Sequence, residues 1–509
     1  MKKNLLLIFT DQQRFDTIAS LGNPIIKTPV LDSMVKRGTS FTSTYTPCPV
    51  CVPARYSMLS GLMPHQTDCT SNEHMHPGNP SMMEFLRDNG YQTHGIGKMH
   101  FTFPNTMFAT MWGFESRDFS EENATRFENA DYFQKFLENN GYGHVKDPHG
   151  VRSEMYMIPQ PSQLPEKLHE STWIIDRSID FLKRRDKSRP FFLMSSFIKP
   201  HPPFESPTPW NKLYRGPEMP LPKRPSNHED LMNYWNYFQN RYKRRDQGRD
   251  DNLIRIMKAA YYCSISFIDY NIGRLLAYLD ENNLTNDTTI IFTSDHGEYL
   301  GDYDCYGKRG FMDSCARVPM IVMDTDMPKD HRCDTPVSLI DIFPTFMEKA
   351  NIKTKVANHG ESLWNVINGK SDRDFVYGQF SKKETGLYGA VTKDYKYIYS
   401  AADEKEYFFD RNFDPLELEN KAYSGMYIKR KLELKNKLIK ALEADNYTDA
   451  VENGDWKKYG VKELRYDIDR YQIYQDPPDS LPNIKGYERS YSFWHEEPFS
   501  GISLHIRNT

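Results

Sequence analysis

Short apolar runs that recur between amphipathic stretches constrain the fold of this chain more than any other feature. Four of them, rich in Ile, Leu, Val and Phe, cover residues 4–10, 92–97, 191–198 and 289–294. Runs of this length are typical of parallel strands that are buried on both faces of a sheet and joined by crossover helices. The pattern therefore predicts an α/β fold.

Each of these runs ends in polar residues that can bind a ligand. These residues are Asp11 and Gln12, Lys98 and His100, His201, and Asp295 and His296. In doubly wound α/β proteins, sites lie beyond the carboxyl ends of the strands, so residues far apart in sequence can meet there. A single polar cluster at a strand end usually only caps a loop, but four with complementary chemistry favour a shared site.

The rest of the chain predicts scaffold helices, insertions and a second subdomain. Helices are expected over 29–37, 171–185 and 253–281, the last directing Ile256, Ala260, Ile268 and Leu275 toward the core. Residues 101–165 and 202–250 are rich in aromatic residues, charge and proline, which suits insertions around the mouth of a site. After about residue 375, short runs at 395–399 and 406–409 precede a charged helix at 427–443. We expect a small antiparallel sheet with a helix there.

Length and charge narrow the class of protein. A chain of 509 residues exceeds what one core normally supports, so we expect a catalytic domain over 1–375 and a C-terminal subdomain and tail over 376–509. The 65 basic and 69 acidic residues give a formal net charge of -4, which argues against a nucleic-acid partner. Asp11 interrupts the first apolar run, no cleavage site follows, and no stretch approaches the roughly 18 apolar residues of a membrane span. A cytoplasmic protein without a membrane partner is expected.

Cys51 stands out among seven cysteines, whose odd number and scatter indicate reduced thiols. Residues 51–61 predict a short helix, with Pro53 in the first turn and Gly61 at the end. Cys51 would lie at the positive end, with Arg55 one turn on, which favours an anionic nucleophile or a bound oxyanion. A buried structural cysteine is the commoner case, and the residues alone leave both open. Cys48 and Cys51 lack the further ligands that a zinc site needs.

The segment 51–61 resembles the sulfatase signature, a Cys-x-Pro-(Ser/Ala)-Arg sequence followed by Ser/Thr-x-Leu-Ser/Thr-Gly. The resemblance continues, in family order, through Asp11, Gly97-Lys98-Met99-His100, Pro200-His201, Asp295-His296-Gly297-Glu298, Lys308, Arg317-Val318-Pro319 and residues 407–420. The family belongs to the alkaline phosphatase superfamily. The resemblance implies a large mixed, mostly parallel sheet sandwiched by helices, with a smaller C-terminal α+β subdomain on an antiparallel sheet.

The resemblance also implies a mechanism. A formylglycine-generating or anaerobic sulfatase-maturating enzyme would oxidise Cys51 to formylglycine, whose hydrate attacks sulfur and later releases sulfate. Asp11, Gln12, Asp295 and His296 would hold a divalent metal. The oxygen-rich set makes Ca²⁺ the first expectation, with Mn²⁺ or Mg²⁺ as alternatives. Arg55, Lys98, His100, His201 and Lys308 would stabilise charge, with His201 and Lys308 serving the leaving oxygen and His100 the release of sulfate. Lys199 is expected to be solvated.

Other activities stay open within and beyond this family. Phosphonate monoester hydrolases share the Cys-x-Pro-Ala-Arg, Asp-Gln and Pro-His-Pro-Pro-Phe sequences, but the Lys98 and His100 pair resembles sulfatases and favours a sulfate ester. Residues 97–101 also resemble choline sulfatase. A sulfated mono- or oligosaccharide is the preferred substrate, with choline sulfate, aryl sulfates, and phosphonate or phosphate esters as alternatives. A hypothesis from another functional class is that the chain is an unmodified, inactive polyanion-binding protein in which Cys51 stays a thiol. A homo-oligomer is left open.

Overall fold

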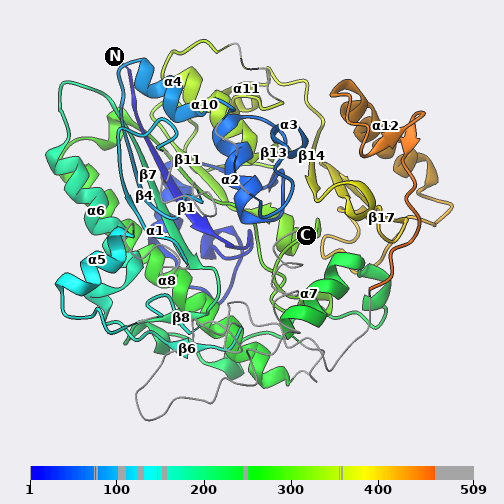
Figure 1. The fold of residues 1–509 in the computed structure, drawn as a ribbon, viewed down its shortest axis with the longest axis horizontal. Coiled ribbons are helices and arrows are strands. Elements are labelled where there is room, and N and C mark those ends of the chain that lie inside the picture. The colour runs from blue at the N-terminus through cyan, green and yellow to red at the C-terminus, as the bar shows by residue number, and fades with distance from the viewer. Residues whose placement is uncertain are drawn as a thin grey trace, which may run out of the picture.

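A computed structural model of the chain describes residues 2–73, 75, 78–100, 111–122, 131–145, 147–151, 157–244, 250–354, 356 and 359–464 (Figure 1). Parts of the expected insertion over 101–165, Phe101 of the choline sulfatase resemblance and the tail from residue 465 lie outside the described residues. Among the helices within these ranges, none combines the length and apolar character that crossing a bilayer requires.

One eight-stranded sheet forms the centre of the molecule. Its strand order is β12 (His331–Cys333), β2 (Thr39–Phe41), β11 (Met320–Met323), β9 (Thr288–Ser294), β1 (Asn4–Asp11), β7 (Phe191–Pro200), β4 (Gln92–Gly97) and β5 (Ser116–Phe119). The strands from β9 to β5 run parallel, whereas β11 is antiparallel to both its neighbours. The four apolar runs are thus adjacent strands whose carboxyl ends meet at one edge.

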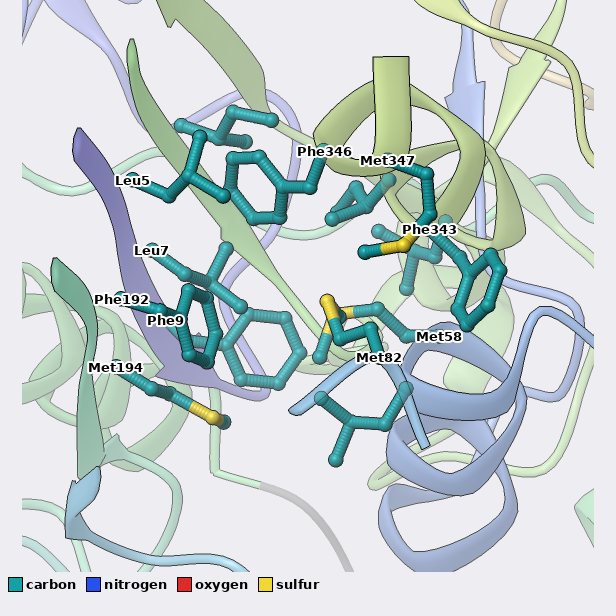
Figure 2. Close-up of a cluster of buried hydrophobic side chains, with 14 of the residues drawn as sticks. Leu5, Leu7, Phe9, Met58, Met82, Phe192, Met194, Phe343, Phe346 and Met347 are labelled. Atoms are coloured by element: carbon teal, nitrogen blue, oxygen red, sulfur yellow. The ribbon is translucent and has the colours of Figure 1, made fainter. Parts of the chain in front are cut away.

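The central strand β1 is buried on both faces because its apolar residues are consecutive. Leu5, Leu7 and Phe9 point into one core and Leu6 and Ile8 into the other. Figure 2 shows the first core, where β1 and β7 face side chains from α2, α4 and α10. Alternate side chains point to opposite faces of a strand, so a continuous apolar run requires helices on both sides.

Helices supply both of these layers. The first core is covered by α2 (Cys51–Ser60), α4 (Met82–Asp88), α10 (Ile342–Lys349) and α11 (Leu363–Ile367). The second is covered by α1 (Pro29–Arg37), α5 (Tyr132–Asn139), α6 (Glu170–Arg184) and α8 (Asp251–Glu281). The remaining α-helices in the described residues are α3 (Pro64–Thr67), α7 (Tyr234–Arg244) and α9 (Asp313–Ala316), together with α12 of the C-terminal part.

A four-stranded antiparallel sheet follows residue 375. It runs in chain order through β14 (Phe375–Phe380), β15 (Leu387–Thr392), β16 (Tyr395–Ser400) and β17 (Lys405–Asp410). Helix α12 (Ile428–Ala444) packs on one face, and the other face shares a core with residues of the main part such as Tyr45 and Phe311. Three small sheets complete the described residues. One has three strands, in the order β10 (Arg317–Val318), β3 (Thr44–Tyr45) and β13 (Val337–Ser338). The other two have two strands each: β18 (Val451–Glu452) with β19 (Asp455–Trp456), and β6 (Gln160–Pro161) with β8 (Glu205–Ser206).

The predicted fold class is confirmed, and the expected helices and strands agree with the structure to within two residues at each end. One side chain was wrongly placed. Ile256 was expected in the core but is 48% exposed, whereas Ile268 and Leu275 are buried as expected. The first turns of α8 bury Ile254 and Met257 in a separate apolar cluster, so Ile256 lies on a different face of the helix and stays exposed. The division at residue 375 stays a prediction.

Candidate active site

The carboxyl ends of the two central strands bring three of the expected metal ligands together. Asp11 ends β1, and Asp295 and His296 follow β9, which pairs with β1 up to Thr10 and Ser294. One ligand atom from each of Asp11, Asp295 and His296 lies within 4.8 Å of the others, and all three residues are buried. The parallel register therefore places residues nearly three hundred positions apart in one cluster.

Backbone geometry fixes how these side chains point. Gln12 has a positive φ of 67°. Its N–H and that of His296 donate to Asp295 Oδ1, each at 2.9 Å. The Gln12 amide nitrogen donates to Glu298, which turns the amide oxygen away from that carboxylate. Within the described residues, Asp11 Oδ1 and Gln12 Oε1 accept no hydrogen bond.

Two buried oxygens without donors are costly unless a cation satisfies them. Together with Asp295 and His296 Nε2, they form a donor set of three oxygens and one nitrogen that fits a divalent ion. His296 Nδ1 lies 2.9 Å from Gly297 O, so Nδ1 carries a hydrogen and leaves Nε2 as the possible ligand. The residues present therefore fit the metal that the sequence predicts.

Cys51 begins α2 next to this cluster. Lys308 Nζ lies 3.3 Å from both Cys51 Sγ and His296 Nε2. Asn72 Oδ1 lies 3.6 Å from Cys51 Sγ and accepts from the N–H of Val52 at 3.4 Å. The helix ends at Gly61, which has φ 73°. The N-terminal position of the thiol, expected from the sequence, is therefore observed.

The charges around Cys51 favour an anion. Burial raises the pKa of the Cys51 thiol, but Lys308, His100 and Lys98 outweigh burial and leave the pKa well below its usual value. Cations and the start of a helix stabilise the ionised form. A position that stabilises a thiolate also stabilises an oxyanion of similar size.

Arg55 organises the carboxylates from within the same helix. The guanidinium is fully buried, and its Nε and Nη2 lie 3.0 Å from Asp295 Oδ2 and 3.1 Å from Asp11 Oδ2. Nη1 donates to Lys98 O at 2.8 Å and to Ser196 Oγ at 2.9 Å. Arg55 thus ties the ends of four strands to α2 and holds two metal-ligand candidates in place.

The other expected cations meet two adjacent acids. Lys98 Nζ lies 2.7 Å from Asp11 Oδ2 and 3.1 Å from Glu122 Oε2, and His201 Nδ1 lies 3.0 Å from the same Glu122 oxygen. Glu121 Oε1 accepts from the N–H of His100 at 2.7 Å. All ten residues that the sequence singled out therefore lie in one connected network of contacts.

Opposite charges set the protonation of this network. Burial and Asp295 push the pKa of Asp11 upward, but Lys98, His201 and Lys308 outweigh them and leave that pKa below its usual value. Burial lowers the pKa of Lys98, but Asp11 and Glu122 raise it and prevail. Asp11 is therefore a carboxylate and Lys98 a cation at neutral pH.

The two histidines differ. Burial and Lys98 lower the pKa of His100, but Cys51 and Glu121 outweigh them and raise it above its usual value. Burial lowers the pKa of His201 well below its usual value although Glu122 opposes this. Beside a Cys51 thiolate, His100 therefore favours its charged form, whereas His201 favours its neutral form.

Sequence reasoning missed several residues of the site. Asn72, Glu121 and Glu122 were not predicted, because they belong to no recognised motif and follow no apolar run. Glu298 stood in the quoted sequence Asp-His-Gly-Glu, which was the available signal, but no role was assigned to it. The expectation for Lys199 was wrong: it is buried, lies 2.9 Å from Glu205 Oε1 and donates to Pro203 O at 2.7 Å. A buried carboxylate keeps this lysine out of solvent.

Family models match nearly the whole described chain. The model described as "Sulfatase" matches residues 3–352, and the model described as "N-sulphoglucosamine sulphohydrolase, C-terminal" matches residues 301–444. The arylsulfatase of Clostridium perfringens is 33% identical over 494 residues, covering 92% of this chain and 100% of that protein. The multifunctional alkaline phosphatase superfamily protein PehA of Trinickia caryophylli is 32% identical and covers 84% and 92% of the two chains.

Solved structures share the fold. The phosphonate monoester hydrolase of Agrobacterium radiobacter superposes with a TM-score of 0.77 at 23% identity, covering 90% of this chain and 100% of that one. BT4656, solved in complex with its substrate D-glucosamine-2-N,6-O-disulfate, superposes with a TM-score of 0.69 at 20% identity, covering 89% and 100%. The expected alkaline phosphatase-like architecture is therefore found.

Proposed function

The chain belongs to the sulfatase family, and from that premise we propose that it hydrolyses sulfate monoesters of mono- or oligosaccharides, using a formylglycine made from Cys51 and a divalent metal ion. Sulfuric ester hydrolysis follows from the family. The observation that carries the rest is the position of Cys51: buried at the start of α2, 3.3 Å from Lys308 Nζ and next to the Asp11, Asp295 and His296 cluster.

Maturation and metal loading would each add one group to this site. Formylglycine at position 51 would supply an oxygen nucleophile in its hydrated form. The metal, for which Ca²⁺ is our first choice and Mn²⁺ or Mg²⁺ the alternatives, would neutralise sulfate oxygens and favour ionisation of that nucleophile. Asp11, Gln12, Asp295 and His296 would hold it, and the donor-free oxygens of Asp11 and Gln12 support this assignment.

The chain's own residues supply the remaining chemistry. Arg55 keeps the two carboxylates in position, and Lys98 and Lys308 present positive charge where charge develops on the sulfuryl oxygens. His201 is our choice for the group that protonates the leaving oxygen, and the nearby Glu122 carboxylate favours its charged form. His100 lies with Asp11 around Cys51, where it can serve the release of sulfate.

A sugar sulfate is proposed on two grounds. The C-terminal part matches a family model named for N-sulphoglucosamine sulphohydrolases. BT4656, which shares the fold, was solved with a sulfated glucosamine as its substrate. Cleavage of phosphate or phosphonate esters is a second candidate, favoured by the similarity to the multifunctional protein PehA.

The first experiment is fragment-ion mass spectrometry of the tryptic peptide 38–55, from protein produced together with a maturation enzyme. We expect an aldehyde at Cys51 and an unmodified thiol at Cys48. The converted protein should then hydrolyse sulfated sugars faster than choline sulfate, aryl sulfates or phosphonate esters. A thiol at Cys51, when the same maturation enzyme converts a control substrate, would instead favour an inactive polyanion-binding protein.

A further inference from the structure

Two adjacent acids that follow β5 contact three of the cationic residues in the site. Glu122 Oε2 lies 3.1 Å from Lys98 Nζ and 3.0 Å from His201 Nδ1. Glu121 turns the other way: its Oε1 accepts from the N–H of Met99 at 3.0 Å, and its Oε2 lies 3.5 Å from His100 Nδ1. Of the two carboxylates, Glu122 is therefore the one that contacts the group suited to protonate a leaving oxygen.

The contacts of His201 define which ring nitrogen carries the mobile proton. Nδ1 lies 2.7 Å from Pro202 O. A carbonyl oxygen can only accept, so Nδ1 carries a hydrogen and donates it to Pro202 O, while the contact with Glu122 Oε2 is one of charge. Nε2 is then the nitrogen that gains and loses a proton during turnover.

The presence of a carboxylate in a site for sulfate has to be explained, because its negative charge repels the substrate. Lys98 and Lys308 disfavour a positive charge on His201, and burial does so as well, while Asp11 and Glu122 favour it. Asp11 is already bound by Lys98 and Arg55. Glu122, with 18% of its side chain exposed, is an anion in contact with the imidazole.

We propose that Glu122 is a positioning residue that orients His201 and stabilises its positive charge, so that Nε2 can protonate the leaving alcohol. This inference rests on the proposed function. As the bond from sulfur to the leaving oxygen breaks, its electron pair stays on that oxygen, which takes the proton from Nε2. The new bond to sulfur comes from the oxygen nucleophile at position 51. His201 is left neutral, and a proton from solvent restores it.

The dependence of the rate on the leaving group tests this role. An aryl sulfate such as 4-nitrophenyl sulfate leaves as a stable anion, whereas an alkyl or sugar sulfate needs a proton. In Glu122→Gln, kcat for the alkyl sulfate should fall about a hundredfold, with about a threefold change or less for the aryl sulfate and for both KM values. Equal losses for the two esters would overturn the proposal, because a merely structural role does not distinguish leaving groups.

Matched variants sharpen the result. Glu121→Gln makes the same change one residue earlier, and it should alter both esters alike. In a His201→Asn background, Glu122→Gln should cause no further selective loss, because the residues act as a unit. A further selective loss in that background would contradict the coupling.

Folding is monitored by thermal unfolding of each metal-loaded variant. If Glu122→Gln does not fold, Glu122→Asp keeps the charge but shortens the reach, and a greater loss on the alkyl ester than on the aryl ester is still expected. Equal losses in that variant overturn the proposal. If the converted wild type hydrolyses neither ester, the proposed function fails and this inference with it. Activity on both esters with an unchanged ratio in the variants overturns only the role of Glu122.

Discussion

At the scale of single residues, the candidate metal site depends on oxygens left without donors. Asp295 uses both of its oxygens for backbone N–H groups and Arg55, whereas Asp11 Oδ1 and Gln12 Oε1 accept no hydrogen bond in the described part of the chain. Buried polar atoms are rarely left in this state without a ligand. Metal binding at these residues can be measured directly, without an assay of activity.

Asp295→Asn should therefore lose the metal. The wild type is expected to retain about one divalent ion per chain after dialysis, and the variant only a small fraction of that, because the amide carries no charge. A chelator should lower the melting temperature of the wild type but not that of the variant. Elemental analysis of both proteins checks this, with Asp326→Asn, an exposed carboxylate, as the control. Wild-type protein that binds no Ca²⁺, Mn²⁺ or Mg²⁺ would contradict the assignment.

The buried acid Glu170, at the start of α6, should make the stability of the fold depend on pH. Burial raises its pKa from 4.5 to about 8, although Lys199 opposes this. The folded protein therefore keeps this proton over a pH range in which the unfolded chain has lost it. Stability from this group is full below pH 4.5 and is lost as the pH rises through about 8.

Glu170→Gln removes that loss. The free energy of unfolding of the variant, relative to that of the wild type, should rise by up to about 1.4 kcal/mol per pH unit between pH 5 and pH 8. Denaturant unfolding of both proteins at several pH values measures the difference. Parallel pH profiles for the two proteins would show that Glu170 ionises normally in the fold.

At the scale of elements, the site depends on where strands stop. Strand β4 ends at Gly97, whose φ is 85°, and Lys98 leaves the sheet directly after it. A Cβ at Gly97 would lie 2.0 Å from Ser196 O of the neighbouring strand. Glycine there lets the chain turn against β7 while keeping Lys98 close to Asp11.

Gly97→Ala should destabilise the fold by at least about 3 kcal/mol, since left-handed strain and a clash with backbone add together. Gly90→Ala is the matched control, because Gly90 also has a positive φ but nothing within 4 Å of its added Cβ. Only the strain remains there, at a cost of about 1–2 kcal/mol. Urea unfolding of both variants gives the comparison, and similar losses would show that the contact with Ser196 is relieved easily.

At the scale of the whole molecule, a buried ion cluster joins the C-terminal sheet to the main part. Lys396 of β16 is fully buried and pairs with Asp313 of α9 and with Glu417. Asp313 also lies 3.0 Å from Arg317 and accepts from the hydroxyl of Tyr45 at 2.7 Å. The short segment from Lys308 to Asp313 thus connects the candidate site to this interface.

Lys396→Met should cost about 3–5 kcal/mol, because two carboxylates would remain buried without their shared cation. The control is Lys393→Met on the preceding turn, whose side chain is 63% exposed and pairs with Asp334, and little change is expected there. Thermal unfolding and limited proteolysis after residue 375 would follow the detachment of the C-terminal sheet. Equal behaviour of the two variants would mean that the apolar contacts alone hold it.

Much of the site could be predicted because its residues end apolar runs or belong to a signature. Asp11, Lys98, His201 and Asp295 each follow a run whose composition marks it as a buried strand. Glu121 and Glu122 could not be predicted in this way. They follow β5, a four-residue edge strand of sequence Ser-Arg-Asp-Phe, which lacks the apolar character of a buried strand.

The amino-acid sequence by itself determined the fold class, the main helices and strands and the candidate nucleophile, since these depend on periodicity and on local motifs. Only the tertiary structure decided which charges meet. Lys199 is buried because Glu205, the first residue of β8, lies beside it. Glu122 contacts His201 because β5 lies beside β4 at the edge of the sheet. Electrostatic energies depend on distances between residues far apart in the chain, and no local pattern encodes those distances.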